Sequence, residues 1–408
     1  MANVNLTIDD ITRESLRVLH QKCNFIGNIV RDYDDSFAQS GAKIGNTLRV
    51  RLPYQYTSAT GATINTTAGA DSVGVSTTLT VNTQRNVPMR FTSNELTMSI
   101  DEFSSRHIEP AMAKMAAMME YDAFTATLNG VANAVSAGGN IGFDDTMNGR
   151  AILQKYLAPM DNRTALLDPQ GMVDLVTDNK SLFNAQDEIN AQYKEGSMGR
   201  FAGFDFYENT ILPTHTNGAE AGTAYVVDGA AEAKTLSATD PDPNNGVLAV
   251  KTGTKTITAG QVFTIGDDVF AVHPETKAST GVLKQFTVTA DATGAGDLSI
   301  SPAIIASGPH QNVSAIPDDG DVLTFLGAAS TAYKQSVLFQ KGFACMGSAD
   351  LVLPKGVHMA SRQNYDGISM RIVQDYDVVK DRVFTRLDCL YGFKVLRPEL
   401  AYKLWHTT

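Results

Sequence analysis

The spacing of hydrophobic and polar positions changes several times along the chain, and each spacing predicts a different element. Residues 5 to 38 set apolar side chains among charged ones as a helix does, with Thr7 placed to act as its N-cap. The next segment, GNTLRVRLPYQY, alternates between apolar residues and the arginines Arg49 and Arg51. The chain is therefore expected to begin with a helix and continue into a strand.

The stretch from Leu52 to Gln84 carries one charged residue, Asp71, and consists mostly of Gly, Ser, Thr and Ala. It has too few large apolar side chains to form a core of its own. Its alternation of Thr and Val nevertheless favours β-structure. Two interpretations stay open: a long two-stranded loop that becomes ordered against a neighbouring molecule, and a disordered segment.

A long helix is predicted from Glu109 onward, because Pro110 suits the first turn of a helix. The helical period brings several apolar residues into an arc of roughly 60°: Ile108, Met112, Met115, Met119 and Ala126. The charged residues lie on different sides, so this helix is expected to pack on more than one side. Methionines without a nearby Cys or His make a poor metal site, and core packing is the preferred interpretation.

The middle of the chain predicts an inserted β-domain. Helix and strand patterns alternate from Asn148 to Thr210, and arginine is then absent from Phe201 to Ser361. Inside this span the period is two, which predicts about six to eight strands over roughly 110 residues, a barrel or a sandwich. Hairpin turns are expected at residues 266–268 and 292–296. The tail after the insertion alternates apolar and charged residues as an amphipathic sheet does.

Composition narrows the function classes. A chain of 408 residues is long enough for two or three domains. A net charge of −11 argues against a dedicated nucleic-acid binder. Three cysteines far apart in the sequence predict reduced, buried thiols. We expect no signal peptide and no membrane span.

The sequence offers little catalytic chemistry. Its histidines and cysteines lack zinc-site spacings, and no nucleotide-binding or nucleophile motif is present. The segment DPDPNNGVLAVK resembles a calcium loop at its first, third and fifth positions. Its glycine is one place late and its twelfth residue is Lys251, so a turn is the better interpretation. No enzyme, cofactor or metal is predicted.

The order of these elements resembles the major capsid (coat) proteins of tailed bacteriophages, whose fold is shared with herpesvirus capsids. The likeness is greatest to the podovirus coat proteins with an immunoglobulin-like or barrel-like insertion. It is carried by LRVRLPYQYT, by VPMRFTSNELTMSIDEFSSRHIEPAMAKMAAMMEYDAF, by FAGFDFYENTILPTHT, by TITAGQVFTIGDDVFAV and by YGFKVLRPEL.

The resemblance implies an α+β fold with an added all-β domain. The implied parts are an N-terminal helical arm (1–45), an extended β-loop (46–95), a peripheral domain with a spine helix (96–147), the first part of a mixed α/β axial domain (148–215), the inserted β-domain (216–332), and the rest of the axial domain with return strands of the peripheral domain (333–408).

The implied function is that of a shell subunit. It would form hexamers and pentamers with copies of itself, assemble with a scaffolding protein into an icosahedral procapsid, and expand when double-stranded DNA, held non-specifically, is packaged through a portal protein. Assembly would occur in the host bacterial cytoplasm, and the product would be the virion capsid.

The resemblance also suggests contact residues. Candidates for scaffold or DNA contacts are Arg13, Arg17, Lys22 and Arg31, and candidates for loop contacts between subunits are Tyr54, Tyr56, Asp71 and Arg85. A solvated helix face remains an alternative for the first group, since acidic residues lie among these bases.

Two other functions stay open. A surface-layer or adhesin-type subunit would also be rich in β-structure, although such a protein normally carries an export signal. An enzyme with a β-sandwich accessory domain would need a convergent catalytic set, which the sequence does not show.

Overall fold

The computed structural model describes residues 23–31, 47–56, 62, 74–92, 109–136, 138–178, 199–219, 225–229, 233–365 and 367–407. Two compact units share the chain. Unit 1 combines Met1–Leu48, Thr78–Ala123 and Cys345–Lys394, and unit 2 combines Arg49–Thr77, Phe124–Ala344 and Val395–Thr408. The described helices and strands confirm the prediction of an α+β fold.

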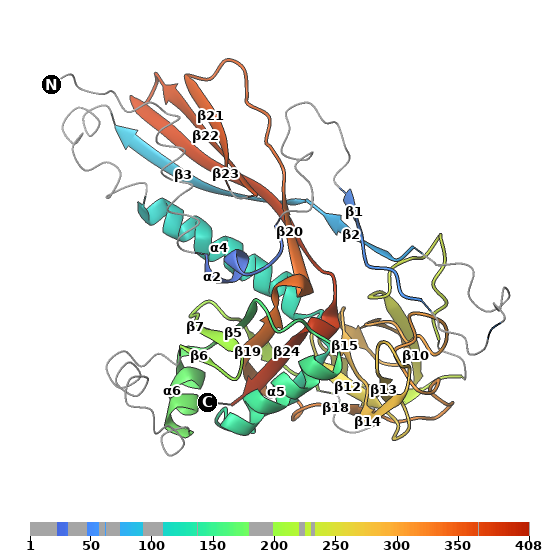
Figure 1. The fold of residues 1–408 in the computed structure, drawn as a ribbon. Helices are drawn as coiled ribbons and strands as arrows, with labels where there is room; N and C mark the ends of the chain where they lie inside the picture. Colours follow the sequence, from blue (N-terminus) through green and yellow to red (C-terminus); the bar gives the residue numbers. More distant parts are fainter. Residues whose placement is uncertain are drawn as a thin grey trace. The chain divides into compact units, whose positions relative to one another are not determined.

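Unit 1 is built on a five-stranded antiparallel sheet of order β20-β23-β22-β21, with β3 also paired to β23. Its long strands run side by side as a ribbon in Figure 1. The strands are β3 (Thr83–Thr92), β20 (Ala344–Ser348), β21 (Met359–Tyr365), β22 (Ile368–Asp377) and β23 (Arg382–Val395).

The alternation in the tail sequence explains the register of this ribbon. Met370 lies opposite Cys389, and Ile372 lies opposite Leu387, so buried apolar side chains meet on one face of β22 and β23. The residues between them point to the other face. The predicted amphipathic sheet is therefore confirmed for these two strands.

Helix α4 (Glu109–Leu128) confirms the predicted long helix. Its buried positions recur at i, i+1, i+4 and i+5, and they include Met112, Met115 and Met119. A four-residue repeat advances about 40° each time on a helix of 3.6 residues per turn, so the buried face winds around α4. Ala126 is exposed because the buried face has turned away by then, and its predicted place in the apolar arc is wrong.

The helix predicted over residues 5 to 38 lies mostly outside the described residues. Within residues 23–31, helix α2 covers only Asn24–Gly27. Val30 instead forms a parallel bridge to Cys345, and its carbonyl accepts a hydrogen bond from the Met346 amide. The prediction is wrong for residues 28–31, because the helix ends at Gly27 and the β-branched Val30 pairs with Cys345 of β20.

Strands β1 (Thr47–Arg51) and β2 (Ser76–Thr80) form a two-stranded sheet at the root of the predicted β-loop. The Arg49 Nε donates to Ser76 Oγ at 2.7 Å, and the Leu52 amide donates to the Val75 carbonyl. Most of the loop beyond Tyr56 lies outside the described residues.

A seven-stranded mixed sheet forms the centre of unit 2, in the order β4-β24-β19-β5-β7-β6, with β8 also paired to β19. Its strands are β4 (Asn133–Ser136), β5 (Arg163–Leu167), β6 (Arg200–Phe201), β7 (Phe204–Glu208), β8 (Thr214–Thr216), β19 (Ala332–Gln340) and β24 (Ala401–His406). The helices are α5 (Phe143–Lys155) and α6 (Pro169–Asp178), with short 3₁₀ turns η3 (Lys341–Phe343) and η4 (Pro398–Leu400).

Gly149 explains how closely α5 can approach this sheet. A Cβ atom at Gly149 would lie 2.7 Å from a ring carbon of Tyr402 and 2.8 Å from a methyl carbon of Leu338. Such distances are too short for any side chain. The glycine therefore lets the helix backbone rest directly on β24 and β19.

The inserted segment contains ten strands within its described part. They are β9 (Val226–Val227), β10 (Gly246–Lys251), β11 (Thr256–Ile257), β12 (Val262–Ile265), β13 (Phe270–Val272), β14 (Ser279–Leu283), β15 (Gln285–Val288), β16 (Ala292–Thr293), β17 (Gly296–Ser301) and β18 (Leu323–Phe325). Six of them form one sheet of order β18-β12-β15-β17-β10-β9, and two small sheets pair β11 with β16 and β13 with β14. Phe263, Phe286, Leu298 and Ile300 are among the residues of its separate hydrophobic core.

One predicted hairpin in this segment is wrong. The turn at residues 266–268 joins β12 to β13, but these strands belong to different sheets. The Gly266 amide donates to the Val322 carbonyl, so the turn carries the chain from one sheet to the next. Of the turn predicted at residues 292–296, only residues 294–295 lie between strands, because Ala292 and Thr293 form β16 and β17 begins at Gly296. The strands β15 and β17 pair antiparallel, with β16 lying in the connection between them and pairing with β11.

Candidate assembly surfaces and the joint of the inserted domain

The residues predicted for loop contacts have different surroundings. Tyr54 and Tyr56 are exposed over 49% and 75% of their surface, large values for aromatic side chains. Asp71 lies outside the described residues. Arg85 is bound within its own unit, where its Nε and Nη2 atoms donate to the two carboxylate oxygens of Asp122 at 2.8 and 2.7 Å.

Asp122 connects three elements of unit 1. Besides the ion pair with Arg85 on β3, it accepts a hydrogen bond of 2.7 Å from the hydroxyl of Tyr391 on β23. Burial opposes the charged form of Asp122, but the hydrogen bonds from Arg85 and Tyr391 outweigh it and lower the pKa of this carboxyl. Burial, and then the hydrogen bond to Asp122, raise the pKa of Tyr391. The Arg85 side chain therefore helps to hold α4 against the ribbon.

The predicted basic group is described only at one position. Arg13, Arg17 and Lys22 lie outside the described residues, and Arg31 follows the bridge between Val30 and β20. Because only Arg31 is described, the structure does not show whether these four side chains lie together. Their role in scaffold or DNA contact stays a prediction.

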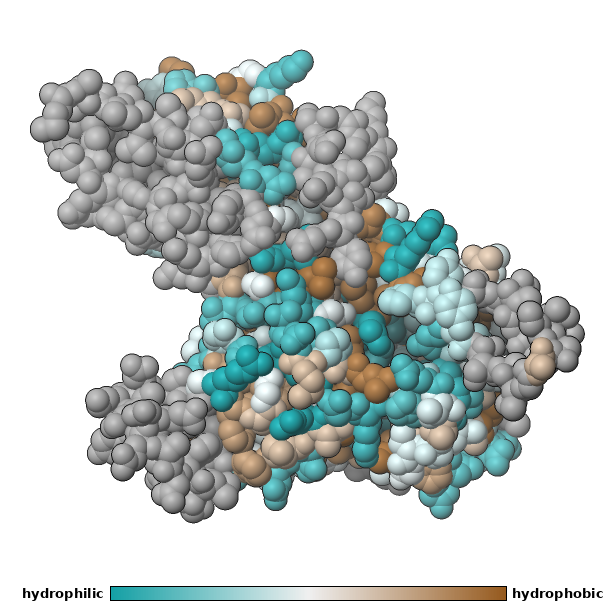
Figure 2. All heavy atoms as spheres, viewed as in Figure 1, coloured by the Kyte–Doolittle hydropathy of each residue, from teal (hydrophilic) through white to brown (hydrophobic). Residues whose placement is uncertain are grey.

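The ribbon of unit 1 ends in an apolar tip. The coloured surface in Figure 2 mixes hydrophilic and hydrophobic residues, so single exposed apolar side chains are ordinary. Val378 and Val379 differ, because they are neighbours in the connection between β22 and β23 and are exposed over 80% and 90% of their surface. Sequence reasoning did not single them out, although two consecutive valines at a strand connection are a readable signal.

A buried carboxylate stiffens the same ribbon. Asp388 on β23 is fully buried and lies opposite Arg371 on β22. Its oxygens accept from Arg371 Nη2 at 2.6 Å and from Arg386 Nε at 2.5 Å. A buried charge with two cationic donors is well compensated, so the register of the ribbon is fixed by polar as well as apolar pairs.

A fully buried lysine lies where the strands β9 to β18 meet the central sheet of unit 2. Lys403 on β24 donates from Nζ to the Gly260 carbonyl at 2.9 Å and to the Leu128 carbonyl at 3.2 Å. Its Nζ also lies 5.2 Å from the ring centre of Trp405. Burial lowers the pKa of Lys403 to about 7. One side chain thus ties the sheet, the end of α4 and the insertion together.

Hydrogen bonds close the entry and exit of the insertion. Asn217 Nδ2 donates to the carbonyls of Leu326 and Ala328 at 2.9 and 3.1 Å, and a hydrogen bond of 3.1 Å joins its Oδ1 to His215 Nε2. The His215 ring stacks on Trp405 at 4.9 Å, and burial, followed by the charge of Lys403, lowers the pKa of His215 to about 4. His215 is therefore neutral at physiological pH.

A side-chain amide adds a further link at this joint. Gln285 on β15 accepts from the Ala134 amide through Oε1 and donates to the Ala134 carbonyl through Nε2, both at 2.9 Å. The side chain thereby completes a ladder-like pair with β4. Sequence reasoning missed Lys403 and Gln285 alike, although a lysine flanked by large apolar residues in AYKLWH is a visible signal.

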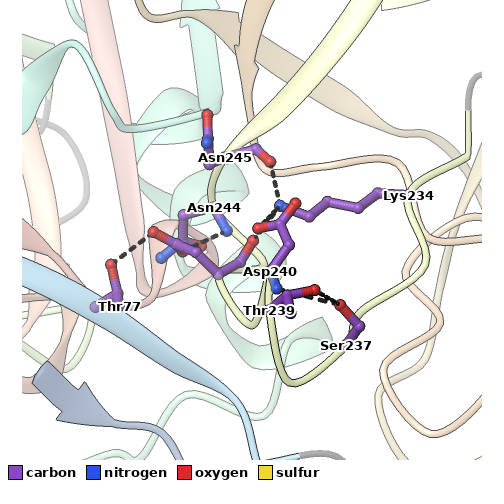
Figure 3. A network of polar contacts seen from close by, with 8 residues as sticks. Thr77, Lys234, Ser237, Thr239, Asp240, Asn244 and Asn245 are labelled. Carbon is purple, nitrogen blue, oxygen red and sulfur yellow. Dashed lines mark hydrogen bonds and ion pairs between the residues drawn. The ribbon is translucent and has the colours of Figure 1, made fainter.

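The segment that resembles a calcium loop is a closed turn around a lysine. Lys234 Nζ donates to Asp240 Oδ1 and to the carbonyls of Asp242 and Asn245, at 2.8, 2.8 and 2.7 Å. Figure 3 shows this amino group between Asp240 and the backbone at Asn245, with Thr77 reaching the loop from β2. Pro243 and Asn244 form a turn ahead of β10, which agrees with the turn interpretation.

The described residues contain no cluster of metal-ligating side chains, and their cysteines are buried. Among them no group of three or more His, Cys, Asp or Glu side chains converges as a metal site would require. The three cysteines are buried and unpaired with one another, as predicted. Burial raises the pKa of Cys345 and Cys389 to about 12, so these thiols are poor nucleophiles. Within the same described part, no helix has the length and apolar character needed to cross a membrane.

Comparison with known proteins agrees with this architecture. A family model described as "P22 coat protein - gene protein 5" matches residues 7–403, nearly the whole chain. The molecule is therefore a major capsid protein of a tailed bacteriophage, a structural subunit that associates with its own copies in the icosahedral shell of the virion. More specifically, the chain belongs to the P22 coat protein family. The resemblance expected from the sequence is confirmed.

Solved capsids are similar at low identity. The capsid of Ralstonia phage GP4 is 6% identical, with 100% of this chain and 95% of that chain covered at a TM-score of 0.48. The capsid of cyanophage P-SCSP1u is 10% identical, with coverages of 90% and 84% and a TM-score of 0.47. Because both scores lie below 0.5, the assignment rests on the family model. No curated protein matches the chain.

Proposed function

We propose that the protein builds its shell as hexamers and pentamers, together with a scaffolding protein and around a portal protein. The first product is a procapsid, which expands as double-stranded DNA enters without sequence-specific binding. The subunit works by packing and carries out no catalysis. The proposal adopts the domain boundaries that the resemblance implies, including an inserted β-domain over residues 216–332.

The observation that carries this proposal is the apolar tip of the ribbon. Val378 and Val379 lie at the end of a long antiparallel ribbon, where contact with another subunit would remove their apolar surface from water. A ribbon stiffened by the buried Asp388 is suited to place such a tip against another subunit. In a shell, copies of the same chain are the partners present at the highest local concentration, and they are the proposed cover of Val378 and Val379.

Electron microscopy of the expressed full chain, alone and with its scaffolding protein, tests the proposal. The wild-type chain is expected to form shells or tubular polyheads. Val378→Asp combined with Val379→Asp should abolish them, because each carboxylate would have to lose water in the contact. Val247→Asp is the matched control, since Val247 is another exposed valine and lies on β10.

Two results would contradict the proposal in different ways. Shells formed by the double variant at wild-type yield would exclude the tip as an assembly contact. Small discrete oligomers from the wild-type chain, even with scaffold, would favour the surface-layer alternative. Circular dichroism of the double variant checks that its fold is retained.

The residues suggested by the family resemblance remain proposals beside the tip. Tyr54 and Tyr56 are exposed enough to contact a neighbouring subunit. Arg85 has its guanidinium occupied by Asp122, so any contact it makes would use its outer edge. Asp71 and the basic group of Arg13, Arg17, Lys22 and Arg31 are retained as loop and scaffold or DNA contacts.

A further inference from the structure

A small cavity in unit 2 has an unusual excess of bases in its wall. The cavity measures about 160 Å³ and lies between the segment after β1, the inserted β-domain and the turn at η4. Its wall contains Lys277, Lys284, His310 and Arg397 but only one acid, Glu399. The remaining wall is uncharged.

Lys284 is the most deeply buried of these bases. Its residue is only 4% exposed, and its Nζ lies 4.6 Å from the ring centre of Tyr156 and donates to the Tyr156 hydroxyl at 3.2 Å. Among the described residues, no carboxylate forms an ion pair with this Nζ. An ammonium has three donors, and a buried charge is ordinarily paired with an anion. Lys284 therefore has donor capacity that its neutral neighbour does not use.

The other bases leave the cavity positive. Lys277 Nζ donates to Gln55 Oε1 at 3.2 Å and to the Gln311 carbonyl at 3.4 Å, and both acceptors are uncharged. Arg397 and Glu399 neutralise each other through a contact of 2.9 Å. Burial, and then the charge of Lys277, lower the pKa of His310, so this ring is neutral at pH 7. Within the described part of the chain, two ammonium groups remain without a counter-charge.

The segments that carry these bases are fixed before any ligand arrives. Lys277 has a left-handed backbone (φ 57°), and its turn is closed by hydrogen bonds between the backbone of His273 and that of Lys277 and Ala278. The loop before His310 is held by Asn312, whose side chain accepts from the Ile305 amide and donates to the Ala303 carbonyl. A preformed wall loses little entropy on binding.

We propose that this cavity binds a small oxyanion, with Lys284 and Lys277 as its principal donors. Oxyanions accept charge-assisted hydrogen bonds from ammonium groups. The volume is enough for several waters but is below the range of roughly 300–1,000 Å³ usual for drug-sized ligands. A phosphate or a carboxylate therefore fits better than a larger molecule. Because Gln55 follows β1 and both lysines belong to the inserted domain, the bound anion would link these two parts of unit 2.

Isothermal titration of the full-length monomer with inorganic phosphate, at constant ionic strength set by chloride, tests this site. The wild-type protein should bind phosphate saturably. Lys284→Gln should weaken binding by roughly tenfold or more, since it removes a charge-assisted contact. Lys255→Gln is the matched control, because Lys255 is an exposed lysine of the same inserted domain, and its affinity should equal that of wild type.

A second variant and a second anion complete the test. Lys277→Gln alters a partly exposed side chain and should also weaken binding, which covers the case in which the Lys284 variant does not fold. Acetate titrated in the same way separates the sources: preference for phosphate indicates a phosphate ligand, and preference for acetate indicates a protein carboxylate. Absence of saturable binding to both anions, or equal affinity in the wild type and both lysine variants, would overturn the proposal. None of these readouts requires shell assembly.

Discussion

Lys403 carries an ionisable group into the interior of unit 2, and none of the described residues places an anion in direct contact with it. Its two hydrogen bonds go to backbone carbonyls, and burial lowers its pKa from 10.5 to about 7. Between these two pH values the unfolded chain holds a proton that the folded chain has released. The unfolded state then binds more protons, so the contribution of Lys403 to stability rises with pH across that window.

Replacement of Lys403 by Met removes this titration. The free energy of unfolding of the wild-type chain minus that of the variant should increase between pH 7 and pH 9, with a slope of at most about 1.4 kcal/mol per pH unit. Denaturant unfolding at several pH values measures the difference, in which groups that do not sense Lys403 cancel. The pKa of His215 depends on Lys403 but lies near 4, below this pH window. Lys255→Met, at an exposed lysine of unit 2, serves as the control variant. A pH-independent difference for the Lys403 variant would contradict the shifted pKa.

At the same scale, the sequence shows which residues are unusual but not how they are compensated. Lys403 stands out as a charge within AYKLWH, and Asp388 as a charge within RLDCL. Lys403 donates to the carbonyl of Leu128, which lies 275 positions away in the sequence, and Asp388 accepts from Arg371, which lies 17 positions away. Such distances depend on strand register and on the packing of the insertion. A local pattern of residues does not contain that information.

At the scale of elements, α4 shows both what periodicity predicts and where it stops. The spacing of apolar residues in the sequence predicts the helix and its three buried methionines. It does not predict that the buried face winds around the helix. Met115 is fully buried and Met118 is half-buried on the neighbouring side. The strands of the ribbon were predictable because period two needs only near neighbours. The hairpin predicted at residues 266–268 was wrong because a turn motif does not reveal which sheet its strands join.

Alanine variants of Met115 and Met118 distinguish an effect on the stability of the monomer from an effect on shell assembly. Met115→Ala should destabilise the monomer by about 2–5 kcal/mol, because it leaves a cavity under the helix. Met118→Ala should cost much less in the monomer, since its side chain already meets solvent in part. If the outer side of α4 packs in the shell, Met118→Ala should instead lower the yield of particles seen by microscopy. Equal destabilisation of the monomer by both variants would show that α4 is buried on all sides before assembly.

At the scale of the whole molecule, the strands β9 to β18 enclose a hydrophobic core of their own, and hydrogen bonds outside that core join them to the rest of unit 2. The core around Phe263 and Phe286 does not include Asn217, whose amide bridges the entry and exit segments. At the next position a Cβ on Gly218 would lie 2.0 Å from the Thr256 carbonyl oxygen, so only glycine fits there. This division suggests two cooperative elements within unit 2 that open at different free energies.

Asn217→Ala tests this division by hydrogen exchange. The variant leaves two carbonyls without their donor, which should cost about 1–3 kcal/mol at the joint. Amides there, such as those of Gly218 and Ser330, should exchange roughly tenfold faster or more, because 1.4 kcal/mol corresponds to a factor of ten. Amides of the β10–β17 ladder should keep wild-type protection, as should every amide in Asn245→Ala, a control at an exposed position. If protection of the ladder falls as much as that of the joint, the insertion and the central sheet form a single cooperative unit, and a shell could not move one without the other.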